Sequence, residues 1–278
     1  MLSAHLSTHR ALKMCITFLY LKKLHHYKAI FAFNRDEINA RATLPLHFWE
    51  NLGIYGGKDD QPGAAPNGTW LGVSKSGKFG ALLNVHSVLM GLLFSPKKQP
   101  RGGLVSGYLV GDAEPSEYMQ HVLDEGKEFN FFNLILGSFV GKPKAFVLNF
   151  VNRTIQPLEE GINCFSNRPP EANDERVNYG KKQFSLLITE LQNLSIKPDE
   201  VQKVVTDRLL TMLRDETFIE NPEGGSSDHI YNDPNLPGCT GGCVSSTVIL
   251  VGEDDEVTYI ECSNVGGRDV KMLKWTIG

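Results

Sequence analysis

Short apolar runs separated by polar turns recur along the chain and predict β-strands. These runs cover residues 16–21, 28–34, 69–74, 78–85, 131–138, 144–150, 162–166, 246–251, 256–262 and 270–277. Apolar residues at helical spacing, or a proline suited to a first helical turn, predict helices over 101–111, 115–126, 177–191 and 201–213. Two stretches rich in Gly, Pro and Asp predict long loops over 53–68 and 220–242.

The order of these elements predicts the fold class. Consecutive strands joined by short turns favour antiparallel sheets, and helices grouped in blocks favour helix layers on the sheet faces. We therefore expect an α+β fold in which helix, sheet, sheet and helix form a four-layer αββα sandwich. The sequence contains no internal repeat and no clear linker, so residues 14–278 are predicted to form one domain.

Composition narrows the function classes. Apolar residues make up 41% of the chain and charged residues 22%, which is enough for a sizeable core. The formal net charge of −4 argues against a nucleic-acid binder. No run of about 18 apolar residues occurs, so we expect no membrane span. The five cysteines form no dense framework, which favours free thiols in a reducing compartment.

Residues 1–13 differ from the rest because they carry Arg10 and Lys13 but no acidic residue. Two interpretations stay open: a weak mitochondrial presequence, or an upstream start with Met14 as the working initiator. The segment lacks the apolar core of a secretory signal. Cytosol and mitochondrion are both compatible with it.

Two motif-like segments are not assigned chemistry. The run Gly72–Lys78 matches most of the phosphate-loop pattern, but Phe79 replaces the Ser or Thr that would bind magnesium. No nucleotide is therefore expected. Cys239 and Cys243 would supply only half of the four ligands of a structural zinc site, so we interpret them as ordinary thiols without a metal.

Cys15 directly follows Met14 and opens an apolar strand. Removal of the methionine would leave a free α-amine on Cys15, and with a pKa of about 8 that amine can act as base for the thiol. The alternative is a buried strand cysteine. The polar run Asn34-Arg35-Asp36-Glu37 ends the next predicted strand. In one interpretation Arg35 binds a carboxylate and Asp36 binds the α-ammonium group of Cys15. In the other, the four residues form a salt-linked loop that shapes a turn.

Five short motifs in a fixed order carry a resemblance to a known family. The chain resembles the NRDE family, of the transport and Golgi organisation type, at Met14–Ile16, Asn34–Glu37, Gly68–Gly72, Leu82–Asn84 and Phe165–Asn167. That family is similar to Ntn hydrolases with an N-terminal cysteine, such as bile-salt hydrolase and penicillin V acylase. The resemblance implies the same αββα fold.

The resemblance implies roles for five residues if the chain is a hydrolase. Cys15 stands where that group has its nucleophile, and Arg35 and Asp36 stand where it places an arginine and an aspartate. Asn84 and Asn167 match amide positions of the same pocket and would donate to the oxyanion, which is worth about 3 kcal/mol per donor.

Two features weaken the hydrolase interpretation. Relatives commonly have Gly-Thr-Arg-Ser-Ser-Thr before a late strand, whereas this chain has Gly242–Thr247 with Val244 in place of the arginine. Residues 1–13 would also lock the nitrogen of Cys15 in a peptide bond unless they are absent or removed.

The resemblance implies a non-catalytic function in intracellular haem trafficking, linked to Golgi organisation, secretion and lipid homeostasis. A haem carrier needs an apolar cleft, a cation for the propionates and an exchangeable axial ligand. Cys15, Arg35 and His86 are the candidates, although a lone histidine such as His86 is more typical of a surface position. The ligand would be haem or another small apolar anion, bound non-covalently because the chain has no CxxCH motif.

Two other functions stay open. One is a cysteine amidohydrolase for a small N-acyl substrate, and the other is a scaffold of the secretory pathway that reuses a hydrolase fold. The expected location is the cytoplasm, with the mitochondrion or association with the Golgi as alternatives.

Overall fold

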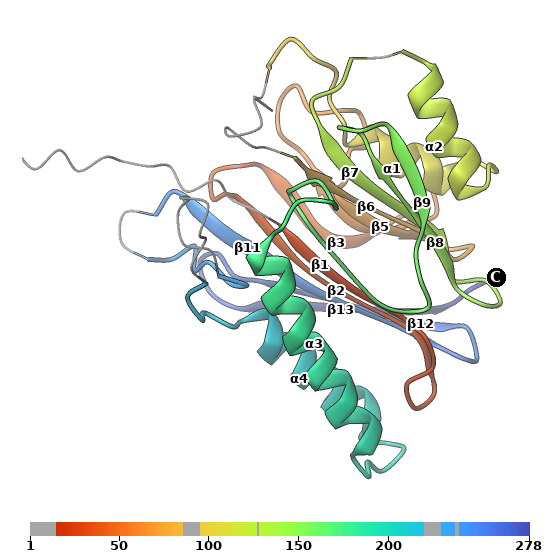
Figure 1. Ribbon diagram of the computed structural model, residues 1–278, viewed down its shortest axis with the longest axis vertical. Helices are drawn as coiled ribbons and strands as arrows, with labels where there is room; N and C mark the ends of the chain where they lie inside the picture. Colours follow the sequence, from red (N-terminus) through yellow and green to blue (C-terminus); the bar gives the residue numbers. More distant parts are fainter. Residues whose placement is uncertain (1–14, 86–94, 127, 220–228, 237–238) are drawn as a thin grey trace, which may run out of the picture.

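Two β-sheets lie face to face in the computed structural model, and a pair of helices covers the outer face of each sheet (Figure 1). The structure describes residues 15–85, 95–126, 128–219, 229–236 and 239–278. All pairings between the named strands are antiparallel. The predicted αββα sandwich of mostly antiparallel sheets is confirmed.

The first sheet has six strands in the order β10-β1-β2-β11-β12-β13. Their bounds are β1 (Ile16–Leu21), β2 (Tyr27–Ile38), β10 (Gly161–Ser166), β11 (Gly241–Gly252), β12 (Glu256–Ser263) and β13 (Asp269–Thr276). The long strands β2 and β11 pair with each other in the middle of this sheet. Strand β1 lies between β2 and β10, so its first residue starts inside the sheet and not at an edge.

The second sheet has seven strands that follow one another in chain order. They are β3 (Thr43–Trp49), β4 (Ile54–Asp59), β5 (Leu71–Ser74), β6 (Lys78–Asn84), β7 (Phe132–Ser138), β8 (Lys144–Asn149) and β9 (Thr154–Pro157). Strands β5 and β6 form the predicted hairpin. The turn between them contains Gly77, whose φ of +87° suits a glycine. The run Gly72–Lys78 therefore leads into a strand, as expected for a segment that is not a phosphate loop.

Helices α1 (Gly103–Val110) and α2 (Pro115–Asp124) pack on the second sheet, and α3 (Glu175–Asn193) and α4 (Val201–Leu213) pack on the first. Pro115 occupies the first turn of α2, as predicted. Asp174 caps α3, because its carboxylate accepts a hydrogen bond from the backbone N–H of Arg176 at 3.1 Å. Among the described residues, no helix combines the length and apolar character needed to cross a membrane.

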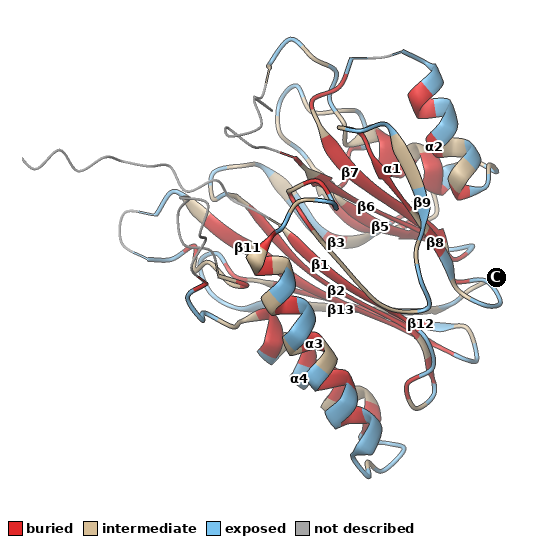
Figure 2. Ribbon diagram, in the orientation of Figure 1, coloured by how far each residue is buried: buried red, intermediate tan, exposed pale blue. Residues whose placement is uncertain are grey.

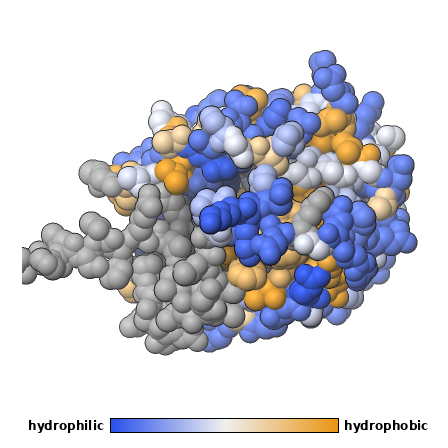
Figure 3. Space-filling model, turned by 90° about the horizontal axis from the view of Figure 1, so that it is seen from above, coloured by the Kyte–Doolittle hydropathy of each residue, from blue (hydrophilic) through white to orange (hydrophobic). Residues whose placement is uncertain are grey.

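Buried hydrophobic residues form three clusters, one between the sheets and one under each helix pair. Figure 2 shows buried positions along the strands of both sheets and on parts of the helices. Strand β2 contributes to two of the clusters, because successive side chains of a strand point to opposite faces. Phe31 and Phe33 lie between the sheets, whereas Ile30 and Ala32 face α3 and α4. The hydrophobic surface seen in Figure 3 is limited to patches set among hydrophilic residues.

The structure corrects several predicted boundaries. Strand β2 continues through Asn34–Glu37 to Ile38, so these polar residues lie inside the strand and not in a loop after it. The predicted loop 53–68 contains β4, and strand β3 precedes it. Strand β11 begins at Gly241, inside the predicted loop 220–242, of which 220–228 and 237–238 lie outside the described residues.

Candidate functional site

A row of three side chains crosses the first sheet on the face that lies against the second sheet. Arg35 of β2 pairs with Ser245 of β11, and the pairing of Ile16 with Asn34 places Cys15 beside Arg35 on the other side. Cys15 packs against the hydrophobic cluster between the sheets. Because residues directly opposite each other in an antiparallel pair are neighbours, Cys15, Arg35 and Ser245 share one site.

The Cys15 thiol is held in its neutral form. Its Sγ donates a hydrogen bond to the backbone carbonyl of Asp36 at 3.7 Å. Burial raises the pKa of this thiol to about 12, and the negative charge of Asp36 adds to the effect. The thiol is therefore protonated at neutral pH, which makes it a weak nucleophile in this state.

The Arg35 guanidinium is buried between the sheets. It stacks on the indole of Trp70, with 3.8 Å between its Cζ and the ring centroid, and its Nη2 lies 3.6 Å from Oε2 of Glu37. Burial lowers the pKa of Arg35. Trp70 can lie so close to the backbone of β4 because residue 57 is glycine, and a Cβ there would stand 2.6 Å from the indole. The geometry presents one cation and one aromatic face between the sheets.

The Asp36 carboxylate lies on the helix side of the same sheet. It accepts a hydrogen bond from Nδ2 of Asn232 at 2.9 Å, and Nη2 of Arg176 is 4.0 Å away. Arg176 is buried in the first turn of α3 and also donates to the carbonyl oxygens of Cys15, His229 and Ile230. Arg176 therefore connects the start of β1 with Asp36 and with α3.

Asn34 has a structural set of contacts. Its Nδ2 donates to the carbonyls of Leu213 at 2.6 Å and Ile230 at 2.9 Å, and its Oδ1 accepts from the Ser246 hydroxyl at 2.8 Å. The residue is fully buried. Asn34 thus fastens the end of α4 to the middle of the first sheet.

The two asparagines assigned by resemblance to the oxyanion site contact each other. Nδ2 of Asn167 donates to the backbone carbonyl of Asn84. Alternation along β6 puts Leu83 between the sheets and Leu82 toward α1 and α2, and Asn84 follows the pattern of Leu82. The structure therefore places the Asn84 carbonyl, and not its side-chain amide, against Asn167. Their function as donors stays a prediction.

Two other positions singled out in the sequence are His86, a candidate haem ligand, and Val244, which replaces an arginine of the family pattern. His86 lies outside the described residues. Val244 stands at the irregularity of β11, between the residues that pair with Asp36 and Arg35. Position 244, where the family pattern has an arginine, is therefore next to the site but carries valine. A different buried guanidinium, that of Arg176, comes from α3.

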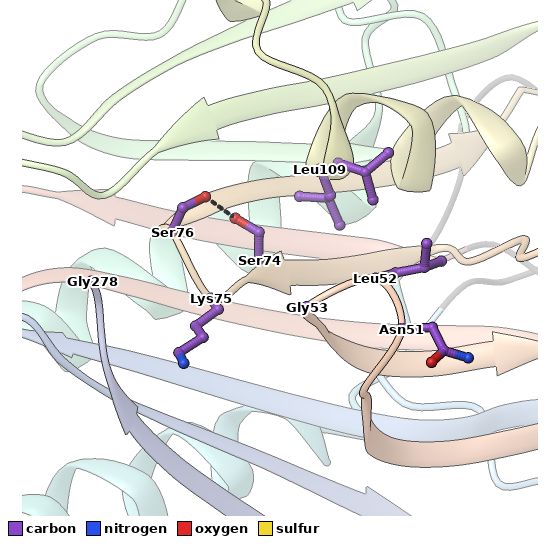
Figure 4. A pocket seen from close by; sticks show the side chains of 9 residues that line it. Asn51, Leu52, Gly53, Ser74, Lys75, Ser76, Leu109 and Gly278 are labelled. Atoms are coloured by element: carbon purple, nitrogen blue, oxygen red, sulfur yellow. Dashed lines mark hydrogen bonds between the residues drawn. The ribbon is translucent and has the colours of Figure 1, made fainter.

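The two surface pockets described in the structure lie away from this site. One, of about 410 Å³, is next to the β5–β6 turn and is lined in part by Ser74, Lys75 and Ser76 (Figure 4). The other, of about 490 Å³, is lined in part by Lys22 and Lys28, which lie where β1 ends and β2 begins, at the other end of these strands from Cys15 and Arg35. Neither is lined by Cys15, Arg35 or the two asparagines.

The layer order, with a cysteine starting a central strand, defines an Ntn-hydrolase-like fold. In agreement, the structure is similar to that of the Caenorhabditis elegans ortholog of N-acylethanolamine-hydrolyzing acid amidase, with a TM-score of 0.50. The match covers 85% of this chain and 92% of the amidase at 12% sequence identity. At that identity the similarity establishes the fold.

The chain belongs to the family described as Transport and Golgi organisation 2, whose sequence profile matches residues 14–264. It is 31% identical over 253 residues to the mouse Transport and Golgi organization 2 homolog, covering 85% of this chain and 87% of the mouse protein. It is 30% identical over 266 residues to the Drosophila melanogaster Transport and Golgi organization protein 2, covering 86% and 87%. The family expected from the motifs is confirmed.

Proposed function

We propose that this protein is an intracellular haem-trafficking factor that binds haem non-covalently beside Cys15 and Arg35. It would take haem from a donor and pass it to an acceptor in the cytoplasm, at mitochondria or at the Golgi. Its contribution to Golgi organisation and secretion would follow from that transfer. In this proposal haem is the cargo and not a resident cofactor.

The observation that carries the proposal is the juxtaposition of a thiol, a buried cation and an aromatic face. Haem offers iron, two carboxylates and a large apolar ring, and it needs a partner for each. Cys15 supplies a sulfur ligand, Arg35 a cation for a propionate, and Trp70 a flat apolar surface. A metal ion deprotonates a thiol that coordinates it, so the raised pKa of Cys15 is compatible with iron binding and slows competing nucleophilic chemistry.

A hemin titration of the full-length chain tests this proposal. We expect saturable binding with a shifted Soret band, and transfer of the haem to a haem-free globin. The C15A variant should lose the band position typical of thiolate ligation, and R35M should bind more weakly. The matched control is C164A, because Cys164 is a partly buried strand cysteine that packs in the helix layer. Absence of saturable binding and of transfer would contradict the proposal.

A second function, N-terminal cysteine amidohydrolase, is favoured by one observation. Cys15 lies between the sheets at the start of a central strand, in a fold shared with an amidase that hydrolyses N-acylethanolamines. Hydrolysis would need the free α-amine of Cys15 as base, because the thiol itself is protonated. Asn84 and Asn167 would then serve as the amide donors predicted from the family.

Intact mass spectrometry of the protein isolated from cells tests this alternative. A chain that begins at Cys15 and releases fatty acid from N-acyl amides, with loss of activity in C15A, would support hydrolysis. A chain that retains residues before Cys15, and that leaves N-acyl amides intact, would exclude self-activated hydrolysis.

A further inference from the structure

Three buried oxygen atoms between the sheets have no hydrogen-bond partner among the described residues. They are Oγ of Ser245, Oγ1 of Thr247 and Oε2 of Glu261. The three residues are 7%, 0% and 4% exposed. A buried polar atom that lacks a partner is costly, so a group of three such atoms indicates a polar occupant.

Strand register makes these residues neighbours of one another and of Arg35 in the first sheet. Thr247 pairs directly with Glu261 of β12, and Ser245 pairs directly with Arg35 of β2. Ser245 and Thr247 are two residues apart, so they point to the same face of β11. That face is the one between the sheets, because Ile249 and Val251 continue it into the central hydrophobic cluster.

Glu261 is oriented by the second sheet. Its Oε1 accepts a hydrogen bond from the backbone N–H of Leu46 in β3 at 2.8 Å, which leaves Oε2 for another partner. Burial raises the pKa of this carboxyl, although Arg35 and Lys271 act in the opposite direction. A raised pKa favours the protonated carboxyl, whose O–H can donate a hydrogen bond.

We propose that Arg35, Ser245, Thr247 and Glu261 form an interior subsite that binds the carboxylate of a ligand. The subsite deepens the proposed function and rests on it, since a haem propionate is one source of that carboxylate. A free fatty acid is another source of the same group.

The donor set explains why a carboxylate fits better than a cation or an apolar group. Arg35 supplies a permanent positive charge and the two hydroxyls supply neutral donors, to which Glu261 adds a third whenever its carboxyl is protonated. A carboxylate has two oxygens and about four lone-pair sites, so it can accept from several of these groups at once. A cationic ligand would instead face the Arg35 guanidinium.

Paired probes separate the contribution of the carboxylate from that of the apolar body. Hemin is compared with hemin dimethyl ester, and decanoate with decan-1-ol, by titration of the full-length protein. The wild type should bind each acid more tightly than its partner. S245A and T247V should each weaken binding of the acids by about tenfold, since each removes one hydrogen bond to a charged group, and should leave the ester and the alcohol unchanged.

One control variant, T206V, and one conservative variant of the subsite itself, E261Q, complete the test. T206V makes the same change at a buried hydroxyl in α4 that also lacks a partner among the described residues, and it should leave all four affinities unchanged. E261Q should keep its affinity for decanoate within about threefold. Its amide oxygen can accept from Leu46, which leaves the NH₂ group to donate where Oε2 stood.

Each outcome has a defined meaning. The subsite is overturned if wild type binds acid and ester with equal affinity, or if E261Q loses affinity tenfold. It is also overturned if S245A and T247V both keep their affinity for the acids, and that result would indicate water as the occupant. If hemin fails to bind but decanoate binds with the expected variant pattern, the haem proposal fails and the carboxylate subsite stands. If hemin binds but shows no acid preference, the haem proposal stands and the subsite fails.

Discussion

Replacement of Arg176 by methionine removes the guanidinium that joins α3, the start of β1 and Asp36. Nε of Arg176 donates to the His229 carbonyl at 2.6 Å, and Nη2 to the Ile230 carbonyl at 3.2 Å. Nη2 also lies 4.0 Å from the Asp36 carboxylate, whose side chain has no exposed surface. Methionine keeps much of the apolar volume, so the change isolates the polar contacts and the charge.

The expected loss of unfolding free energy is about 4 kcal/mol. Removal of one partner from a buried ion pair costs about 3–5 kcal/mol, because the remaining charge stays buried. The carbonyls of His229 and Ile230 also lose a donor, but part of that cost falls within the same range because the contacts act as one network. Since whole domains are stable by only about 5–15 kcal/mol, R176M should leave a marginally stable protein.

Urea unfolding followed by circular dichroism measures this loss. The matched control is R208M, because the exposed Arg208 pairs with Glu190 at 3.1 Å on the helix surface and should contribute less than about 1 kcal/mol. Adding D36N to R176M removes the uncompensated charge, so the double variant should be more stable than R176M alone. A loss below about 1 kcal/mol in R176M, or no recovery in the double variant, would refute the reasoning.

Three further outcomes follow from the geometry. At pH 8 a thiol with a pKa of about 12 is ionised in about one molecule in ten thousand, so iodoacetamide followed by mass spectrometry should label exposed Cys239 long before Cys15. N34A removes the Asn34 donor to the Leu213 carbonyl and one of two donors to the Ile230 carbonyl, which keeps Arg176, and it should lower the unfolding free energy by about 2–4 kcal/mol in urea. N193A, at an exposed helix position, should change it by less than about 0.5 kcal/mol. The raised pKa of Glu261 means that the folded state holds this proton more tightly than the unfolded state. Wild type should therefore lose stability relative to E261Q as pH rises above the ordinary glutamate pKa of about 4.3, and a constant difference in parallel urea titrations would contradict this.

Strand and helix prediction succeeded where local chemistry was unambiguous. Strand β1 has the predicted bounds, and α2 begins at Pro115 as expected. Strand β3 was missed because it contains Pro45 and several exposed residues, which weaken the alternation that identifies a strand. The polar run after Phe33 predicts that β2 ends at residue 34, because consecutive polar residues usually close a strand, whereas the strand continues to Ile38.

The site was only partly predictable, because its partners come from distant parts of the chain. The sequence predicts that Cys15 and the Asn34–Glu37 run lie together, and the structure places them side by side, with the Cys15 thiol hydrogen-bonded to the Asp36 carbonyl. Arg176 was missed, since it is separated from Cys15 by 161 positions and nothing local marks it except the Asp174 cap. In the sequence Trp70 stands out only as part of a family motif, and Gly57, which leaves room for its ring, is the one other signal.

The turn between β1 and β2 helps to set the strand register of the polar run at the far end of this hairpin. Leu24 and Tyr27 exchange two backbone hydrogen bonds of 2.9 Å there, and these bonds set which β2 residue meets each β1 residue. Deletion of one residue from the turn would shift the pairing of β2 with β1 by one residue. The side chain of Arg35 would then face the helices and that of Asp36 would face the second sheet, although the Asn-Arg-Asp-Glu motif itself would be unchanged.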